Sequence, residues 1–121
     1  MMTRALQLFE VDAQLRNVPA VAVRGEVDIA AVPALELALD GAIRESVGGF
    51  VLDLHEIRFM DCSGLRLILR ARALLAREDR ALAIVCTPGP IRRLFTETGI
   101  EDLLSLFASP EEATAAPLST G

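Results

Sequence analysis

The sequence contains no tryptophan, tyrosine or lysine, one histidine and two cysteines among its 121 residues. Single-stranded nucleic acid binds by stacking its bases on exposed aromatic rings, so the scarcity of such rings disfavours that ligand. All 12 basic residues are arginines, and 17 acidic residues give a net charge of −5. Because a net-acidic domain is also poorly suited to the phosphates of duplex DNA, we expect no nucleic acid among its partners.

The histidine, cysteine and glycine patterns exclude most catalytic and metal sites. One histidine cannot supply a zinc-binding cluster, and Cys62 and Cys86 lie 24 residues apart with no CxxC pair. Phosphate-binding glycine loops and the HExxH and GxSxG patterns are also absent. We therefore expect a protein that is not an enzyme, that needs no cofactor or metal, and that keeps two free thiols.

Targeting and membrane segments are missing as well. The sequence opens on Met1-Met2-Thr3-Arg4-Ala5 without a secretory hydrophobic region, and no apolar run approaches the ~18–20 residues of a membrane span. Together with the free thiols, these absences predict a cytoplasmic protein in a reducing compartment, without membrane insertion.

What the sequence does contain is a pattern of alternating strands and helices. Hydrophobic residues make up 52% of the chain, which is enough for a folded core. The apolar periodicity predicts strands over 6–11, 20–27, 50–54, 81–86 and 103–107, and helices over 31–46 and 63–77. A third helix over 91–98 is ended by Gly99, and the capping box Ser109-Pro110-Glu111-Glu112 opens a last helix from 109 onward. The order ββαβαβα(β)α predicts an α/β fold with a mixed sheet of four to five strands and about four helices. We expect one domain over residues 1–115 and a disordered tail over 116–121.

The polar segment after the predicted strand 50–54 is interpreted as a loop. It holds His55, Glu56 and Arg58, and a histidine in a loop is usually solvated. Asp53 and Asp61 flank the segment, so a carboxylate pair for acid–base catalysis is one hypothesis. Carboxylates at strand ends and helix starts are common without such a role, and we favour that simpler interpretation.

The most informative segment runs from Phe59 to Leu69, where a buried strand gives way to a helix. Functional contacts gather at this edge of open α/β sheets. Either Asp61 or Ser63 can cap the helix, and the functional interpretation leaves Ser63 with an exposed hydroxyl. A helix N-terminus tolerates the added charge of a phosphate. Gly64 is interpreted as leaving room for another protein to approach.

The predicted helix 63–77 has two different faces. Leucine, isoleucine and alanine side chains fill one broad arc, with Arg72 at its edge, and Arg66, Arg70 and Arg77 fall on the opposite side. This arginine stripe fits a partner surface and an ordinary solvated face about equally well.

Three segments resemble the STAS domain family, and most closely its small stand-alone anti-sigma factor antagonists from bacteria. Gly25-Glu26-Val27-Asp28 resembles the motif that ends the second strand of the family. Phe59-Met60-Asp61-Cys62-Ser63-Gly64-Leu65 resembles its phosphorylation loop, usually Asp-Ser-Ser-Gly or Asp-Ser-Thr-Gly, with Cys62 in place of the first hydroxyl residue. Pro90-Ile91-Arg92-Arg93-Leu94-Phe95 and Thr98-Gly99-Ile100 resemble the third helix and the turn after it.

The resemblance implies partner switching. In the family, an unphosphorylated antagonist binds an anti-sigma factor that is also a serine kinase, so the sigma factor is released. Phosphorylation of the residue before the glycine weakens this binding, and a serine phosphatase restores it. On this chain the implied phosphorylation site is Ser63. The expected partner-binding residues are Asp28, Asp61, Cys62, Ser63, Gly64, Leu65, Arg66 and Arg70.

Three other functions fit a domain of this kind. A STAS subunit of a larger assembly, such as a lipid-transport ATPase, would not need the phosphoserine. A small-molecule or nucleotide sensor would use Asp28 and the loop near Ser63, and a small enzyme would need a catalytic constellation that the sequence does not show. Cys62 is either a half-buried small residue or a redox-sensitive thiol, and Cys86 is expected in the core.

Overall fold

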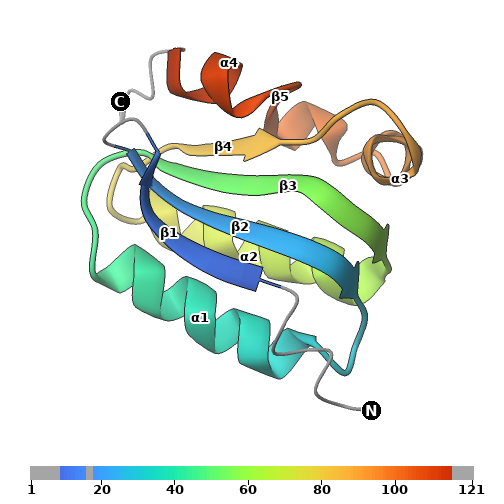
Figure 1. The fold of residues 1–121 in the computed structure, drawn as a ribbon, viewed down its shortest axis with the longest axis horizontal. Helices are drawn as coiled ribbons and strands as arrows, with labels where there is room; N and C mark the ends of the chain where they lie inside the picture. Colours follow the sequence, from blue (N-terminus) through green and yellow to red (C-terminus); the bar gives the residue numbers. More distant parts are fainter. Residues whose placement is uncertain (1–8, 16–17, 116–121) are drawn as a thin grey trace.

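Five strands pair side by side in the order in which they follow one another along the chain. The computed structural model describes residues 9–15 and 18–115, drawn in colour in Figure 1. β1 and β2 are antiparallel, whereas β2, β3, β4 and β5 are parallel neighbours. The strands are β1 (Phe9–Leu15), β2 (Val18–Val27), β3 (Phe50–Met60), β4 (Leu82–Val85) and β5 (Ser105–Phe107). This arrangement confirms the predicted α/β fold with a mixed sheet.

Helices cover both faces of the sheet (Figure 1). The helices are α1 (Val32–Arg44), α2 (Cys62–Ala76), α3 (Pro90–Glu97), the 3-10 helix η2 (Glu101–Leu103) and α4 (Pro110–Ala115). α1 and α2 pack on one face, where Leu52 and Ile84 belong to the larger core. α4 packs on the other face through Ala113, against Val51 and Val85. Because consecutive strand residues point to opposite faces, buried strands covered on both sides read as continuous apolar runs.

β3 is longer than the sequence predicted, and the predicted loop after residue 54 is wrong. The segment with His55, Glu56 and Arg58 continues the strand as far as Met60 and stays paired with β2. Its polar side chains are exposed because β4 ends opposite Asp53, so the far half of β3 has lost its neighbour on that side.

Two irregularities in the pairing of β2 with β3 let this extension reach the end of β2. The register shifts between Ala22 and Arg24 and again between Gly25 and Glu26. Gly25 has a positive φ of 83°, which glycine adopts without steric cost. Such bulges bend and twist a strand, and they disturb the period-two alternation on which strand prediction depends.

The extension of β3 also places the two carboxylates of the hypothetical catalytic pair too far apart to act together. Asp53 and Asp61 lie eight positions apart along extended chain, which corresponds to roughly 25 Å. His55 Nδ1 lies 2.6 Å from Asp53 Oδ1, and His55 Nε2 lies 3.3 Å from Glu56 Oε2. His55 therefore contacts two carboxylates on a strand and is not a loop residue.

Most other predicted boundaries agree with the structure within two residues. Gly99, with φ of 81°, follows α3, and the Ile100 N–H donates to the Phe95 carbonyl as in a Schellman motif. Ser109 Oγ accepts from the Glu112 N–H, which confirms it as the cap of α4. The last strand is shorter than predicted because η2 takes up Leu103. The predictions for residues 6–8 and 116–121 lie outside the described residues.

Arg80 joins the segments that follow α1 and α2. Its buried guanidinium donates to the carbonyls of Ile43 at 2.9 Å and Gly48 at 2.7 Å. It also donates to Ser46 Oγ at 2.8 Å and pairs with Glu78 at 3.2 Å. One arginine therefore satisfies the backbone of a connection that lies more than thirty residues away in the sequence.

Candidate functional site

The candidate site lies at the edge of the sheet where β2 and β3 end together. Val27 and Met60 are paired as the last residues of the two strands, and the Asp61 N–H donates to the Val27 carbonyl at 3.3 Å. Because the strands are parallel, the segments that follow them, starting at Asp28 and Asp61, meet at the same edge. Two of the three motifs found in the sequence are thereby brought together.

Asp61 caps α2. Its backbone is extended, and its carboxylate accepts from the Ser63 N–H at 2.9 Å. Its carbonyl accepts from the Gly64 N–H at 3.0 Å and the Leu65 N–H at 3.3 Å. Of the two capping residues that the sequence allowed, Asp61 therefore has this role. The partly exposed Ser63 hydroxyl forms no hydrogen bond within residues 9–15 and 18–115, so it is available for chemistry.

Asp28 shapes the turn between β2 and α1. One carboxylate oxygen, Oδ1, accepts from the N–H groups of Ala30 and Ala31, both at 3.1 Å. Since Ala31 is the N-cap residue of α1 and has no side-chain oxygen, Asp28 takes over part of the capping. Asp28 thus stands at the predicted edge and also has a structural role there.

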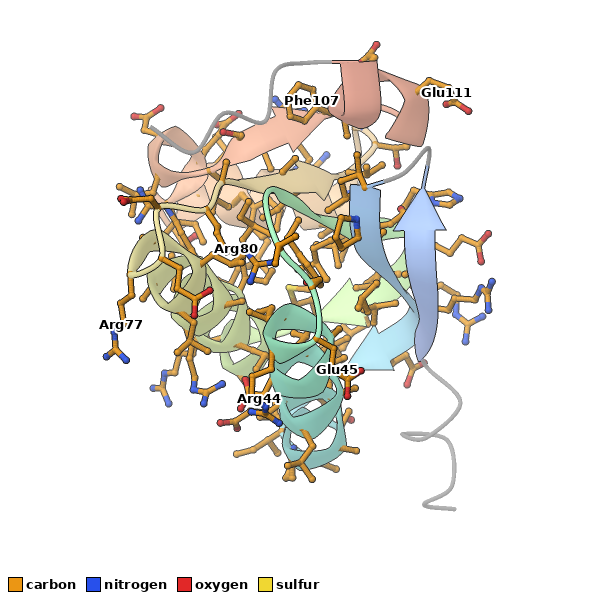
Figure 2. All side chains as sticks on the ribbon, turned by 90° about the vertical axis from the view of Figure 1, so that its left-hand side faces the viewer. Arg44, Glu45, Arg77, Arg80, Phe107 and Glu111 are labelled. Atoms are coloured by element: carbon orange, nitrogen blue, oxygen red, sulfur yellow. The ribbon has the colours of Figure 1, made fainter. Side chains whose placement is uncertain are left out.

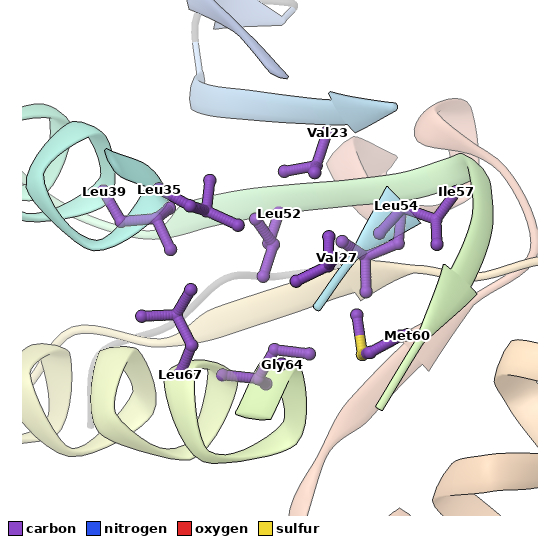
Figure 3. A pocket seen from close by; sticks show the side chains of 11 residues that line it. Val23, Val27, Leu35, Leu39, Leu52, Leu54, Ile57, Met60, Gly64 and Leu67 are labelled. Atoms are coloured by element: carbon purple, nitrogen blue, oxygen red, sulfur yellow. The ribbon is translucent and has the colours of Figure 1, made fainter. Parts of the chain in front are cut away.

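Gly64 does not leave room for a partner, and that interpretation is wrong. The residue is buried, and a Cβ atom built on it would lie 2.5 Å from Met60 Cγ and 3.1 Å from Val27 Cγ1. Gly64 lets α2 approach the ends of β2 and β3, as Figure 3 shows around a small apolar cavity. The need for glycine here comes from packing inside the protein.

We expect Gly64→Ala to destabilise the fold by about 1–3 kcal/mol through overpacking. The adjacent cavity is only about 10 Å³, close to one water-sized sphere, so it cannot absorb a displaced Met60 side chain. Urea unfolding of the purified variant measures the change. The matched control is Gly41→Ala in α1, where nothing lies within 4 Å of the added carbon. Alanine is the better helix former, so the control should be neutral or stabilising, and equal losses in both variants would contradict the packing argument.

The other predicted partner-binding residues differ in what they present to solvent. Leu65 is buried in the larger core, whereas Cys62 and Arg66 are exposed. Arg70 is exposed but pairs with α1, donating to both carboxylate oxygens of Asp40 at 2.7 and 3.0 Å. The hydrogen bond from Arg70 lowers the pKa of Asp40 from its ordinary value. The predicted arginine stripe is thus divided between Arg70, which forms an interhelical ion pair, and the exposed Arg66 and Arg77, which pair with no described residue.

Two exposed apolar side chains at this edge were not among the predicted site residues. Ile29, beside Asp28, is 75% exposed, and Phe59, two residues before Asp61, is 48% exposed. An apolar residue inside a polar turn is a signal that sequence inspection could have used for Ile29. Phe59 was hidden by the disturbed alternation of β3, which made its orientation unpredictable.

The two cysteines have different environments, and both are free thiols. Cys86 is buried at the end of β4, as predicted, and burial raises the pKa of its thiol to about 11. Cys62 is exposed at the start of α2, so its interpretation as a half-buried residue is wrong.

Within the described ranges, no group of three or more His, Cys, Asp or Glu side chains could hold a metal ion. No helix there is long and apolar enough to cross a membrane.

The sequence of the chain matches a known family. Residues 11–113 match the family described as the STAS domain. The chain belongs to the STAS domain family. Among STAS proteins, the anti-sigma-B factor antagonist of Staphylococcus aureus is 33% identical over 84 residues, which span 69% of this chain and 78% of that protein.

Solved STAS structures have the same fold. An anti-sigma factor antagonist from Mycobacterium paratuberculosis superposes with a TM-score of 0.80 at 26% identity, covering 88% of this chain and 90% of that one. The Bacillus cell fate determinant SpoIIAA, solved in its phosphorylated form, superposes with a TM-score of 0.67 at 24% identity, covering 88% and 96% of the two chains. The latter likeness shows the fold alone.

Proposed function

We propose that this STAS domain is a cytoplasmic anti-sigma factor antagonist whose partner is an anti-sigma factor with serine kinase activity. Phosphorylation of Ser63 releases the partner, and a serine phosphatase restores binding. The observation that carries the proposal is the partly exposed Ser63 hydroxyl in the first turn of α2, next to the edge where β2 and β3 end, which forms no hydrogen bond with any described residue. The names of its relatives as anti-sigma factor antagonists support the general role.

A phosphate on Ser63 would change the surface and leave the fold in place. The cap of α2 is formed by the Asp61 carboxylate and the Ser63 backbone N–H, so the Ser63 hydroxyl has no structural duty. A phosphate adds about −1.5 to −2 charge at a helix N-terminus, which accommodates it. The same charge stands beside Asp61 and near Asp28, so it makes this edge strongly acidic and opposes a partner that fits the neutral hydroxyl.

The proposed docking surface consists of Asp28, Ile29, Phe59, Cys62, Ser63 and Arg66. Ile29 and Phe59 supply apolar area, which carries most of the affinity in protein interfaces. The charged residues around them set orientation and association rate. Leu65 and Gly64 hold the surface in shape from beneath, because both are buried.

The first test is recovery of the tagged protein from its own cells, with and without stress, followed by intact-mass measurement and phosphosite mapping. We expect an ATPase of the serine kinase type to co-purify, and a single phosphate on Ser63 whose occupancy changes with conditions. A transporter ATPase that co-purifies with unphosphorylated protein under every condition would contradict the proposal. That result would favour the alternative of a STAS subunit in a larger assembly.

A further inference from the structure

A hollow of about 200 Å³ opens near the far end of α2 from Ser63. It lies between the last turns of α2, the start of β4, and the junction of η2 with β5. Figure 2 views the molecule from this end, with Arg77 and Arg80 labelled. The hollow is lined by Arg72, Ala76, Arg80, Ala81, Leu82, Leu103, Leu104 and Ser105.

The charged groups of this hollow are all positive. The Arg80 side chain is only 6% exposed, donates to backbone carbonyls and pairs with Glu78, which is not part of the lining, so the unpaired positive charge of the wall belongs to Arg72. Arg72 is exposed and has no hydrogen bond or ion pair with any described residue, and the same holds for the Ser105 hydroxyl. No aspartate or glutamate is part of the lining. The unpaired Arg72 guanidinium and the unused Ser105 hydroxyl favour an anionic group.

The rest of the wall is apolar and suits a small apolar group of a ligand. Ala76, Leu82 and Leu104 lie along it, and Leu103, 50% exposed, stands beside them. A cavity of about 150 Å³ is enough to hold a benzene ring, so a hollow of this volume suits a ligand the size of one ring with a charged substituent. A bare inorganic anion would leave the apolar wall uncovered.

We propose that this hollow binds a small organic carboxylate with an apolar body of about one ring. The carboxylate pairs with the Arg72 guanidinium and accepts from the Ser105 hydroxyl, and the apolar body covers Leu103 and Leu104. This site is separate from the proposed partner surface, which lies at the other end of α2. The two proposals can therefore succeed or fail independently.

Titration of the full chain with benzoate, followed by amide chemical shifts, tests the proposal. We expect saturable shifts centred on residues 72–76 and 103–105, and clearly weaker binding of neutral benzamide. Arg72→Ala should weaken benzoate binding roughly tenfold, because it removes a charge-assisted hydrogen bond. Arg77→Ala is the matched control, since Arg77 lies five residues further on, at the C-cap of α2, and does not line the hollow. Ser63→Ala should also bind benzoate like the parent.

Three results would overturn the proposal. If titration with benzoate causes no saturable change in the amide chemical shifts, the hollow does not bind this class of ligand. Equal affinity for benzamide would mean that the positive wall does not recognise the carboxylate. An Arg77→Ala loss as large as that of Arg72→Ala would show general attraction to an arginine-rich surface. Circular dichroism of both variants confirms that each is folded before its affinity is compared.

Discussion

Ser63→Glu is expected to lose most of the affinity for the anti-sigma factor, whereas Ser63→Ala should bind at least as tightly as the parent. A like-charge contact placed at an interface costs several kcal/mol, so we expect a loss of about 2 kcal/mol or more, roughly thirtyfold in Kd. Alanine removes only a hydroxyl that forms no hydrogen bond with the described residues. Isothermal titration of each variant against the purified partner measures both effects.

The matched control for this result is Ser105→Glu, which adds the same charge at the opposite end of the molecule. Its affinity for the partner should equal that of the parent. Thermal unfolding should show that Ser63→Glu is as stable as Ser63→Ala, because the cap of α2 rests on Asp61. Unchanged binding by Ser63→Glu, or an equal loss in Ser105→Glu, would refute a charge switch at this edge.

Arg80→Leu is expected to lower the free energy of unfolding by about 3 kcal/mol. The change removes charge-assisted hydrogen bonds to Ile43, Gly48 and Ser46. Each hydrogen bond to a charged group contributes about 1.5–3 kcal/mol, and the partly buried Gly48 carbonyl would lose this donor. Leucine keeps much of the apolar part of the arginine side chain, so the loss of unfolding free energy measures the contribution of the guanidinium group. Urea unfolding followed by circular dichroism gives the free energy.

Two further variants make this stability test decisive. Arg77→Leu, three residues earlier and exposed, should change the free energy of unfolding by less than about 0.5 kcal/mol. Arg80→Lys keeps the charge but not the planar set of donors, so it should fall between the parent and Arg80→Leu. If Arg80→Leu does not fold, Arg80→Lys still measures the contribution. Equal stability of Arg80→Lys, Arg77→Leu and the parent would show that Arg80 is not needed to hold this connection.

Local chemistry was enough to predict most elements and to single out the segment proposed as the site. The periodicity of apolar residues located α1 and α2, because burial of one helix face repeats every 3.6 residues. A glycine stop located α3, and a capping box located α4. Asp61 was recognised as a possible cap and Gly99 as a helix stop, since both act on neighbouring backbone groups. That Asp28 and Ser63 belong to one surface was implied only by the resemblance to the STAS family.

Contacts between distant residues decided the rest. β3 extends to Met60 because β2 accompanies it through two shifts of register, and no local pattern encodes those shifts. Gly64 is needed by Met60 and Val27, and Arg70 is turned toward Asp40, thirty residues before it. No local pattern marks Arg80 as buried, and it is buried because the connection after α1 folds over it. The sequence by itself determined the helices and most of the strand segments, since these depend on near neighbours along the chain. Only the tertiary structure decided which side chains at the edge remain free to meet a partner.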